Sequence, residues 1–72
     1  MNSASTIIVS VNGQPHTLAA NGAVHDLVRA LSLEGKRIAV ELNGRIVARS
    51  RYAETPLQHG DRLEIVGAVG GG

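Results

Sequence analysis

Two Asn-Gly dipeptides, Asn12-Gly13 and Asn43-Gly44, each stand between short stretches in which apolar and polar residues alternate. Asn-Gly supplies the two positive φ angles that a tight hairpin turn requires. An alternating stretch on either side of such a turn is typical of paired strands. The sequence therefore predicts two β-hairpins. Their strands are expected at residues 6–11 and 16–19, and at residues 37–42 and 45–48.

The segment between the two hairpins predicts one amphipathic helix. Its apolar residues recur at i, i+3, i+4 and i+7, which places them on one stripe of a helix. A glycine in the left-handed conformation commonly ends a helix, so Gly35 is expected to do so here. The stripe consists of Val24, Leu27, Val28 and Leu31.

The chain beyond the second hairpin predicts an irregular loop and one last strand. Residues 49–57 lack a clean period and contain Pro56, which indicates a loop with one helical turn. Residues 62–66 alternate, so Ile65 is expected to point inward with Leu63 and Val66 to point outward. In the first hairpin, Pro15 removes a backbone donor, which an outer strand tolerates.

These elements in this order predict an α+β fold, a ubiquitin-like β-grasp in which a mixed sheet of roughly five strands packs on one helix. A chain of 72 residues is expected to form a single domain, 1–72, with a disordered leader at 1–5 and a flexible reactive tail at 67–72. Because Tyr52 is the one aromatic residue, the core must be built from Ile, Val, Leu and Ala.

Size and composition exclude several classes of function. A domain of this length buries only about 60% of its unfolded surface, so a self-contained enzyme with an enclosed pocket is not expected. The absence of Cys excludes disulfides, thiolate nucleophiles and iron–sulfur clusters, and it fits a reducing cytoplasm. A net charge of +1 does not favour nucleic acid or a membrane surface. The free chain is expected to be a monomer.

The three histidines, His16, His25 and His59, do not have the spacing of metal ligands. A metal site needs several convergent ligands. We therefore expect solvent-facing histidines and no metal.

Five of the seven basic residues fall between positions 36 and 51, where the one acidic residue is Glu41. This cluster allows two interpretations, an ordinary solvated face or a docking surface for an acidic partner, where charge would speed association. On the second interpretation, the residues expected to bind the partner are Val66, Val69, Arg45, Arg49 and Arg51.

The three terminal glycines, Gly70, Gly71 and Gly72, are the most informative feature for function. A run without Cβ atoms can thread a narrow channel. Residues 67–72 extend for roughly 20 Å, enough to place the terminal carboxylate of Gly72 in the active site of another protein. Transfer of AMP from ATP would give that carboxylate a good leaving group, and a sulfur nucleophile could then form a thiocarboxylate or a thioester. The Mg²⁺ and the side chains for this transfer would belong to the activating enzyme, so the chain itself is expected to bind no cofactor.

Three segments near the C-terminus are similar to the ThiS family, the sulfur carriers of thiamine biosynthesis. They read VARSRYAETPL at 47–57, GDRLEIV at 60–66 and VGGG at 69–72, and the similarity extends over residues 7–72. The resemblance implies that a ubiquitin-activating-type (ThiF-like) adenylyltransferase activates Gly72 with ATP and Mg. Cysteine-derived sulfur then gives a thiocarboxylate, and a ThiG-like thiazole synthase takes up that sulfur. The chain would be a protein co-substrate and not an enzyme.

Three alternatives remain open at the level of sequence. The chain could be a carrier of the type found as the small subunit of molybdopterin synthase. It could be a protein tag whose Gly72 is joined to lysines of target proteins. It could also be a β-grasp module that binds a partner without any covalent step, which would not require a terminal Gly-Gly.

Overall fold

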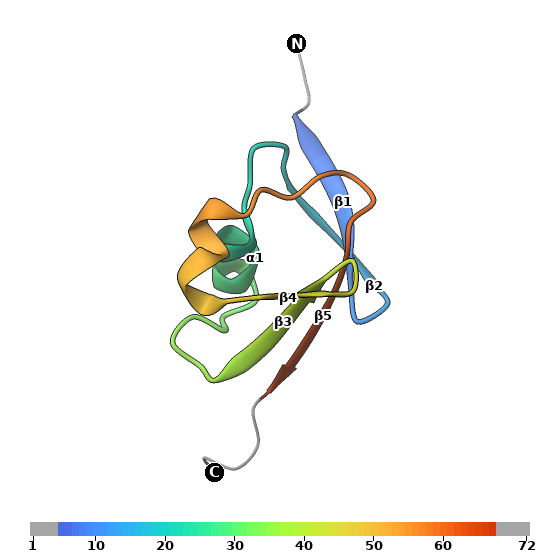
Figure 1. Cartoon of the computed structure of the whole chain (residues 1–72). Helices are drawn as coiled ribbons and strands as arrows, with labels where there is room; N and C mark the ends of the chain where they lie inside the picture. Colours follow the sequence, from blue (N-terminus) through green and yellow to red (C-terminus); the bar gives the residue numbers. More distant parts are fainter. Residues whose placement is uncertain (1–4, 68–72) are drawn as a thin grey trace.

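A five-stranded mixed sheet packs with one face against a single helix in the computed structural model, which describes residues 5–67 (Figure 1). The strand order is β2-β1-β5-β3-β4, with β1 and β5 parallel and the other neighbours antiparallel. The predicted α+β, β-grasp architecture is confirmed. The elements are β1 (Thr6–Val11), β2 (Gln14–Ala19), α1 (Val24–Ala30), β3 (Ile38–Leu42), β4 (Arg45–Val47), a 3-10 helix η1 (Arg49–Glu54) and β5 (Arg62–Gly67).

The core lies between the sheet and α1 and is almost wholly aliphatic. Alternate residues of β1 and β5 point inward, as the period of two predicts, and the stripe of α1 covers them. Tyr52 of η1 joins this core and is only 7% exposed. The buried residues are Ile7, Val9, Val11, Val24, Leu27, Val28, Val40, Tyr52, Leu57, Leu63 and Ile65.

The helix ends earlier than predicted, and Gly35 does not end it. Leu31 is the C-cap, and Ser32 takes a left-handed φ of 60°. The N–H of Leu33 donates to the carbonyl of Val28 at 2.9 Å, and that of Ser32 donates to the carbonyl of Arg29 at 3.0 Å. This bond pair is a Schellman cap, in which Leu33 turns back onto the core. The packing of Leu33 accounts for a left-handed residue that is not glycine.

Other boundaries shift by a few residues. Strand β2 begins at Gln14 and includes Pro15, which the edge position of β2 tolerates as predicted. The segment expected to be a loop with one helical turn contains the six residues of η1. Strand β5 continues to Gly67, where the tail was predicted to begin. Residues 1–4 of the predicted leader and 68–72 of the predicted tail lie outside the described residues.

The asparagines of both hairpin turns hold the central strand β5. The side chain of Asn12 donates to the carbonyl of Ile65 at 2.9 Å and accepts from the N–H of Ile65 at 2.8 Å. On the other side, Asn43 accepts from the N–H of Arg62 at 2.9 Å and donates to a carboxylate oxygen of Asp61 at 3.0 Å. Both asparagines also have the positive φ that their turns require. Each residue thus forms a turn and fastens a strand far away in sequence.

Replacing Asn12 with glycine tests this second role of the turn. Glycine keeps the φ of 52° but removes both bonds to Ile65. We expect Asn12→Gly to lower the free energy of unfolding by about 1–3 kcal/mol, since two partly buried hydrogen bonds are lost. Asn21→Gly is the matched control, because Asn21 is exposed and its side chain makes no hydrogen bond within residues 5–67. Equal losses in urea denaturation would show that the bonds to Ile65 do not matter.

Among the described helices, none has the length and apolar character needed to span a membrane.

Candidate functional site

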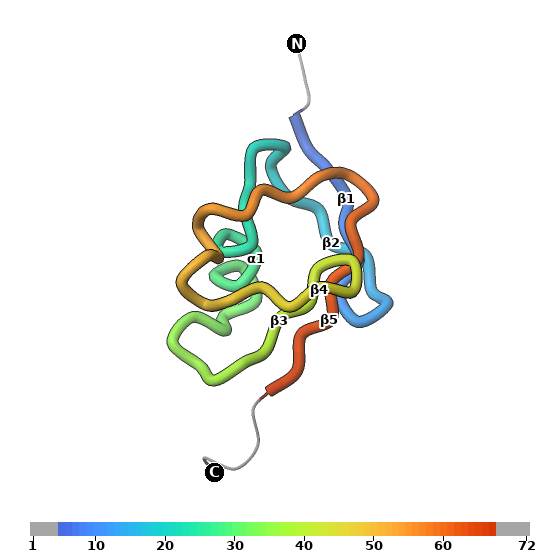
Figure 2. The backbone as a smooth tube through the Cα atoms, in the orientation of Figure 1, coloured from blue at the N-terminus to red at the C-terminus, as the bar shows by residue number. Residues whose placement is uncertain are grey.

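Strand β5 ends at Gly67, and the glycine-rich C-terminal segment follows it in the sequence. Strand β5 lies between β1 and β3, and its last residue, Gly67, pairs with Ile38 at the start of β3. Figure 2 shows that this end of β5 lies at the opposite side of the molecule from the start of β1. A Cβ built on Gly67 would meet no atom within 4 Å, so the side-chain position of this residue is unobstructed. We call this end of the molecule the tail root.

The outer face of the sheet, which points away from α1, exposes several apolar side chains. Val66 is 58% exposed, whereas its neighbour Ile65 is 7% exposed, so the predicted inward and outward directions in β5 are confirmed. Ile8 of β1 and Ile46 of β4 are also exposed. Val66 pairs with Ala39, next to the tail root. Val69, predicted to act with Val66, lies outside the described residues, as do Gly70, Gly71 and Gly72.

The predicted arginines do not gather into one patch with Val66. Arg45 and Arg51 line one groove together with Thr55, between β4 and η1. Arg51 also forms an exposed ion pair with Glu54 at 3.6 Å. Arg49 lines a different groove, on the other side of η1. The basic cluster seen in the sequence is therefore divided between two places.

The groove that contains Arg49 lies between α1, the loop after it, and η1. Its volume is about 240 Å³, and its lining includes His25, Lys36, Ile38, Arg49 and Tyr52. Ile38 belongs both to this groove and to the pair with Gly67, so the groove adjoins the tail root. The sequence did not predict that this groove adjoins the end of β5. The pairing register of β3 with β5 places Ile38, which lines the groove, beside Gly67.

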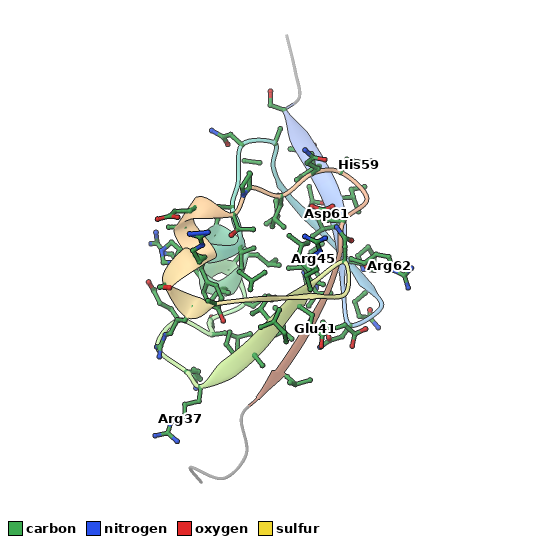
Figure 3. The ribbon with its side chains drawn as sticks, viewed as in Figure 1. Arg37, Glu41, Arg45, His59, Asp61 and Arg62 are labelled. Atoms are coloured by element: carbon green, nitrogen blue, oxygen red, sulfur yellow. The ribbon has the colours of Figure 1, made fainter. Side chains whose placement is uncertain are left out.

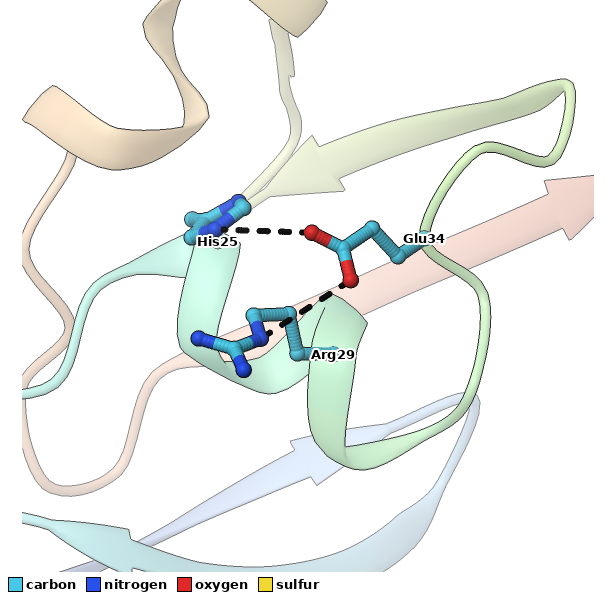
Figure 4. A network of polar contacts seen from close by, with 3 residues as sticks. All are labelled: His25, Arg29 and Glu34. Carbon is cyan, nitrogen blue, oxygen red and sulfur yellow. Dashed lines mark ion pairs between the residues drawn. The ribbon is translucent and has the colours of Figure 1, made fainter.

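One acidic residue, Glu34, is found among the lining residues of this groove. Its carboxylate lies 3.9 Å from His25 Nε2 and 3.8 Å from Arg29 Nε, as Figure 4 shows. Exposed pairs of this kind contribute little to stability. Both partners belong to α1, so the carboxylate of Glu34 is oriented toward that helix.

The histidines occupy three separate places in the described fold. His59 is exposed as predicted, yet its Nδ1 accepts a hydrogen bond from the N–H of Ile8 at 3.1 Å. His16 in β2 and His25 in α1 are half-buried. Within residues 5–67, no group of three or more potential metal ligands comes together.

The arrangement of one helix on a mixed sheet, with the last strand in the middle and its end open, defines a ubiquitin-like β-grasp protein. A sequence model described as "ThiS family" matches residues 9–72. The crystal structure of a thiamine biosynthesis protein (ThiS) from Geobacter metallireducens superposes with a TM-score of 0.78 at 33% identity, covering 92% of this chain and 100% of that one. The chain belongs to the ThiS family.

Two similar sequences give this assignment more detail. The sulfur carrier protein ThiS of Bacillus subtilis is 43% identical over 71% of this chain and 77% of its own length. A thiazole synthase of Paramagnetospirillum magneticum is 39% identical over 86% of this chain, which spans only 19% of that protein. A region similar to this chain therefore occurs within a much longer thiazole synthase.

Proposed function

We propose that this chain is a sulfur carrier of thiamine biosynthesis, whose terminal Gly72 is adenylated and converted to a thiocarboxylate that donates sulfur for thiazole formation. The observation that carries the proposal is the ThiS-family match, which runs through the last residue, Gly72. The position of Gly67 at the end of β5 supports it, because a Cβ built there would meet no atom within 4 Å. In this role the chain is a protein co-substrate that works in the cytoplasm.

The proposed chemistry takes place at one carboxylate in two displacements. First, an oxygen of the Gly72 carboxylate attacks the α-phosphorus of ATP, and pyrophosphate leaves. Next, cysteine-derived sulfur at the oxidation level of sulfide (HS⁻) attacks the acyl carbon, AMP leaves with the bonding electrons, and loss of the S–H proton leaves the thiocarboxylate. Mg²⁺ and the cationic groups that stabilise the charge belong to the adenylating enzyme, of the ubiquitin-activating (ThiF-like) type. This chain contributes a terminus that can reach that active site.

The sulfur acceptor in this proposal is a ThiG-like thiazole synthase. Its support is the thiazole synthase that includes a region similar to this chain. On the outer face of the sheet, Val66 is exposed beside the tail root. We assign the docking of partner proteins to Val66 and Val69.

Mass spectrometry of the intact chain tests the proposed function directly. The chain is co-expressed with the adenylating enzyme and a cysteine desulfurase of its own organism and then purified. We expect a mass increase equal to the replacement of one oxygen by sulfur, located at Gly72. A ladder of conjugates on lysines would indicate a protein tag instead, and an unmodified chain would favour a non-covalent binding module.

Deleting residues 70–72 should separate folding from function. The described core lies entirely within residues 7–65, so we expect the melting temperature to change by no more than a few degrees. Adenylation should be lost, because the carboxylate would end about 10 Å short of its position in the intact chain. Thermal denaturation and ATP–pyrophosphate exchange measure the two effects. A large drop in melting temperature would mean that the glycines are structural.

A further inference from the structure

Three basic residues lie beside the tail root or line the groove that adjoins it. Ile38 pairs with Gly67 on one side and lines the groove with Lys36 and Arg49 on the other. Arg37 directly precedes Ile38, and Figure 3 shows its side chain projecting from the end of the molecule at which β5 terminates. We call Lys36, Arg37 and Arg49 the cationic rim.

The charges of the cationic rim are not balanced by acidic groups of the described fold. Within residues 5–67, none of its three members forms an ion pair, whereas Arg51 pairs with Glu54. The one acidic residue of the adjoining groove, Glu34, is already engaged by His25 and Arg29. All three rim residues are exposed. The tail root and its adjoining groove therefore present three exposed positive charges that have no ion-pair partner within residues 5–67.

Other basic residues lie well away from the tail root. Arg45 pairs with Leu42, four residues along β3 from Ile38, which corresponds to about 13 Å. Arg62 begins β5, five residues before Gly67, at about 17 Å. Both distances exceed the screening length of about 8 Å at physiological ionic strength. A partner at the tail root would therefore interact more strongly with Arg37, which directly precedes Ile38, than with Arg45 or Arg62.

We propose that the cationic rim docks against acidic side chains at the mouth of the channel through which the adenylating enzyme takes the tail. This inference rests on the proposed function, because it assumes a protein that draws in the C-terminus. Any such protein must come down on the end of the molecule from which the tail emerges. Charge complementarity around that point steers the encounter and orients the tail toward the channel. The cationic rim shares Arg49 with the docking residues expected from the sequence. It adds Lys36 and Arg37 and leaves out Arg45 and Arg51.

Association kinetics with the adenylating enzyme of the same organism test the cationic rim. The rim variant combines Lys36→Glu, Arg37→Glu and Arg49→Glu. The control variant combines Arg45→Glu, Arg51→Glu and Arg62→Glu, which changes the net charge by the same amount. We expect the rim variant to associate at least about tenfold more slowly at low salt, and the control to change by less than about twofold. Near 1 M salt the two should converge, because screening then acts within about 3 Å.

Two results would overturn the cationic rim. One is an unchanged association rate for the rim variant, and the other is an equal slowing of the control, which would reflect net charge alone. Circular dichroism checks that each variant folds, and the single variant Arg37→Glu replaces the triple one if it does not. ATP–pyrophosphate exchange with the wild-type chain distinguishes a failure of the proposed function from a failure of the cationic rim alone. Without exchange the proposed function fails, and the rim fails with it; exchange without a rim effect refutes the rim alone.

Discussion

Adding one alanine after Gly72 should reduce ATP–pyrophosphate exchange with the adenylating enzyme to background while the melting temperature stays unchanged. The extra residue displaces the carboxylate by about 3.3 Å, and an error of about 1 Å in the position of a reacting group can cost on the order of 100-fold in rate. It also introduces a Cβ into a channel shaped for glycine. The addition lies beyond β5 and the core residues, which explains why stability should not change.

The matched control for this extension is one alanine inserted after Met1, at the other end of the chain. That variant adds the same mass at the opposite end of the sequence and should be adenylated at the wild-type rate. If the C-terminally extended chain were still adenylated and still supported thiazole formation at normal rates, Gly72 would not be the reactive group. The proposed function would then fail, and a non-covalent binding module would be the better explanation.

Leu27→Ala should destabilise the protein by about 2–5 kcal/mol, the usual range for emptying a fully buried leucine site. Leu27 is 0% exposed and lies on the stripe of α1 that faces the sheet. Where in this range the loss falls depends on how far the neighbouring side chains move into the cavity. Urea denaturation of the wild type and the variant measures the difference in unfolding free energy.

The control for Leu27 is an alanine substitution at Val66, another aliphatic residue but one that is 58% exposed. Val66→Ala should alter the unfolding free energy by less than about 0.5 kcal/mol, as is usual for surface positions. A loss at Leu27 as small as this would mean that the stripe of α1 does not face the core.

At the candidate site, the sequence predicted the direction of single side chains but not which distant residues lie together. The outward direction of Val66 could be predicted, because direction in a strand depends only on odd and even position. The grouping of the basic residues could not. Arg49 and Lys36 line the same groove because η1 lies beside α1 and the loop that follows it, whereas Arg45 of β4 pairs with Leu42, at the other end of β3 from Ile38. No local pattern encodes these pairings.

The local elements were determined by the sequence itself. Two Asn-Gly turns between alternating segments and a stripe at helical spacing determine two hairpins and one helix, because those signals act between neighbours in the chain. The tertiary structure decided the rest. Ser32 ends α1 because Leu33 turns onto the core, and Asn12 fastens β5 across 53 residues. Gly67 lies beside Ile38, and Ile38 lines a groove with Arg49, for the same reason: contacts between distant segments exist only once the sheet has packed on the helix.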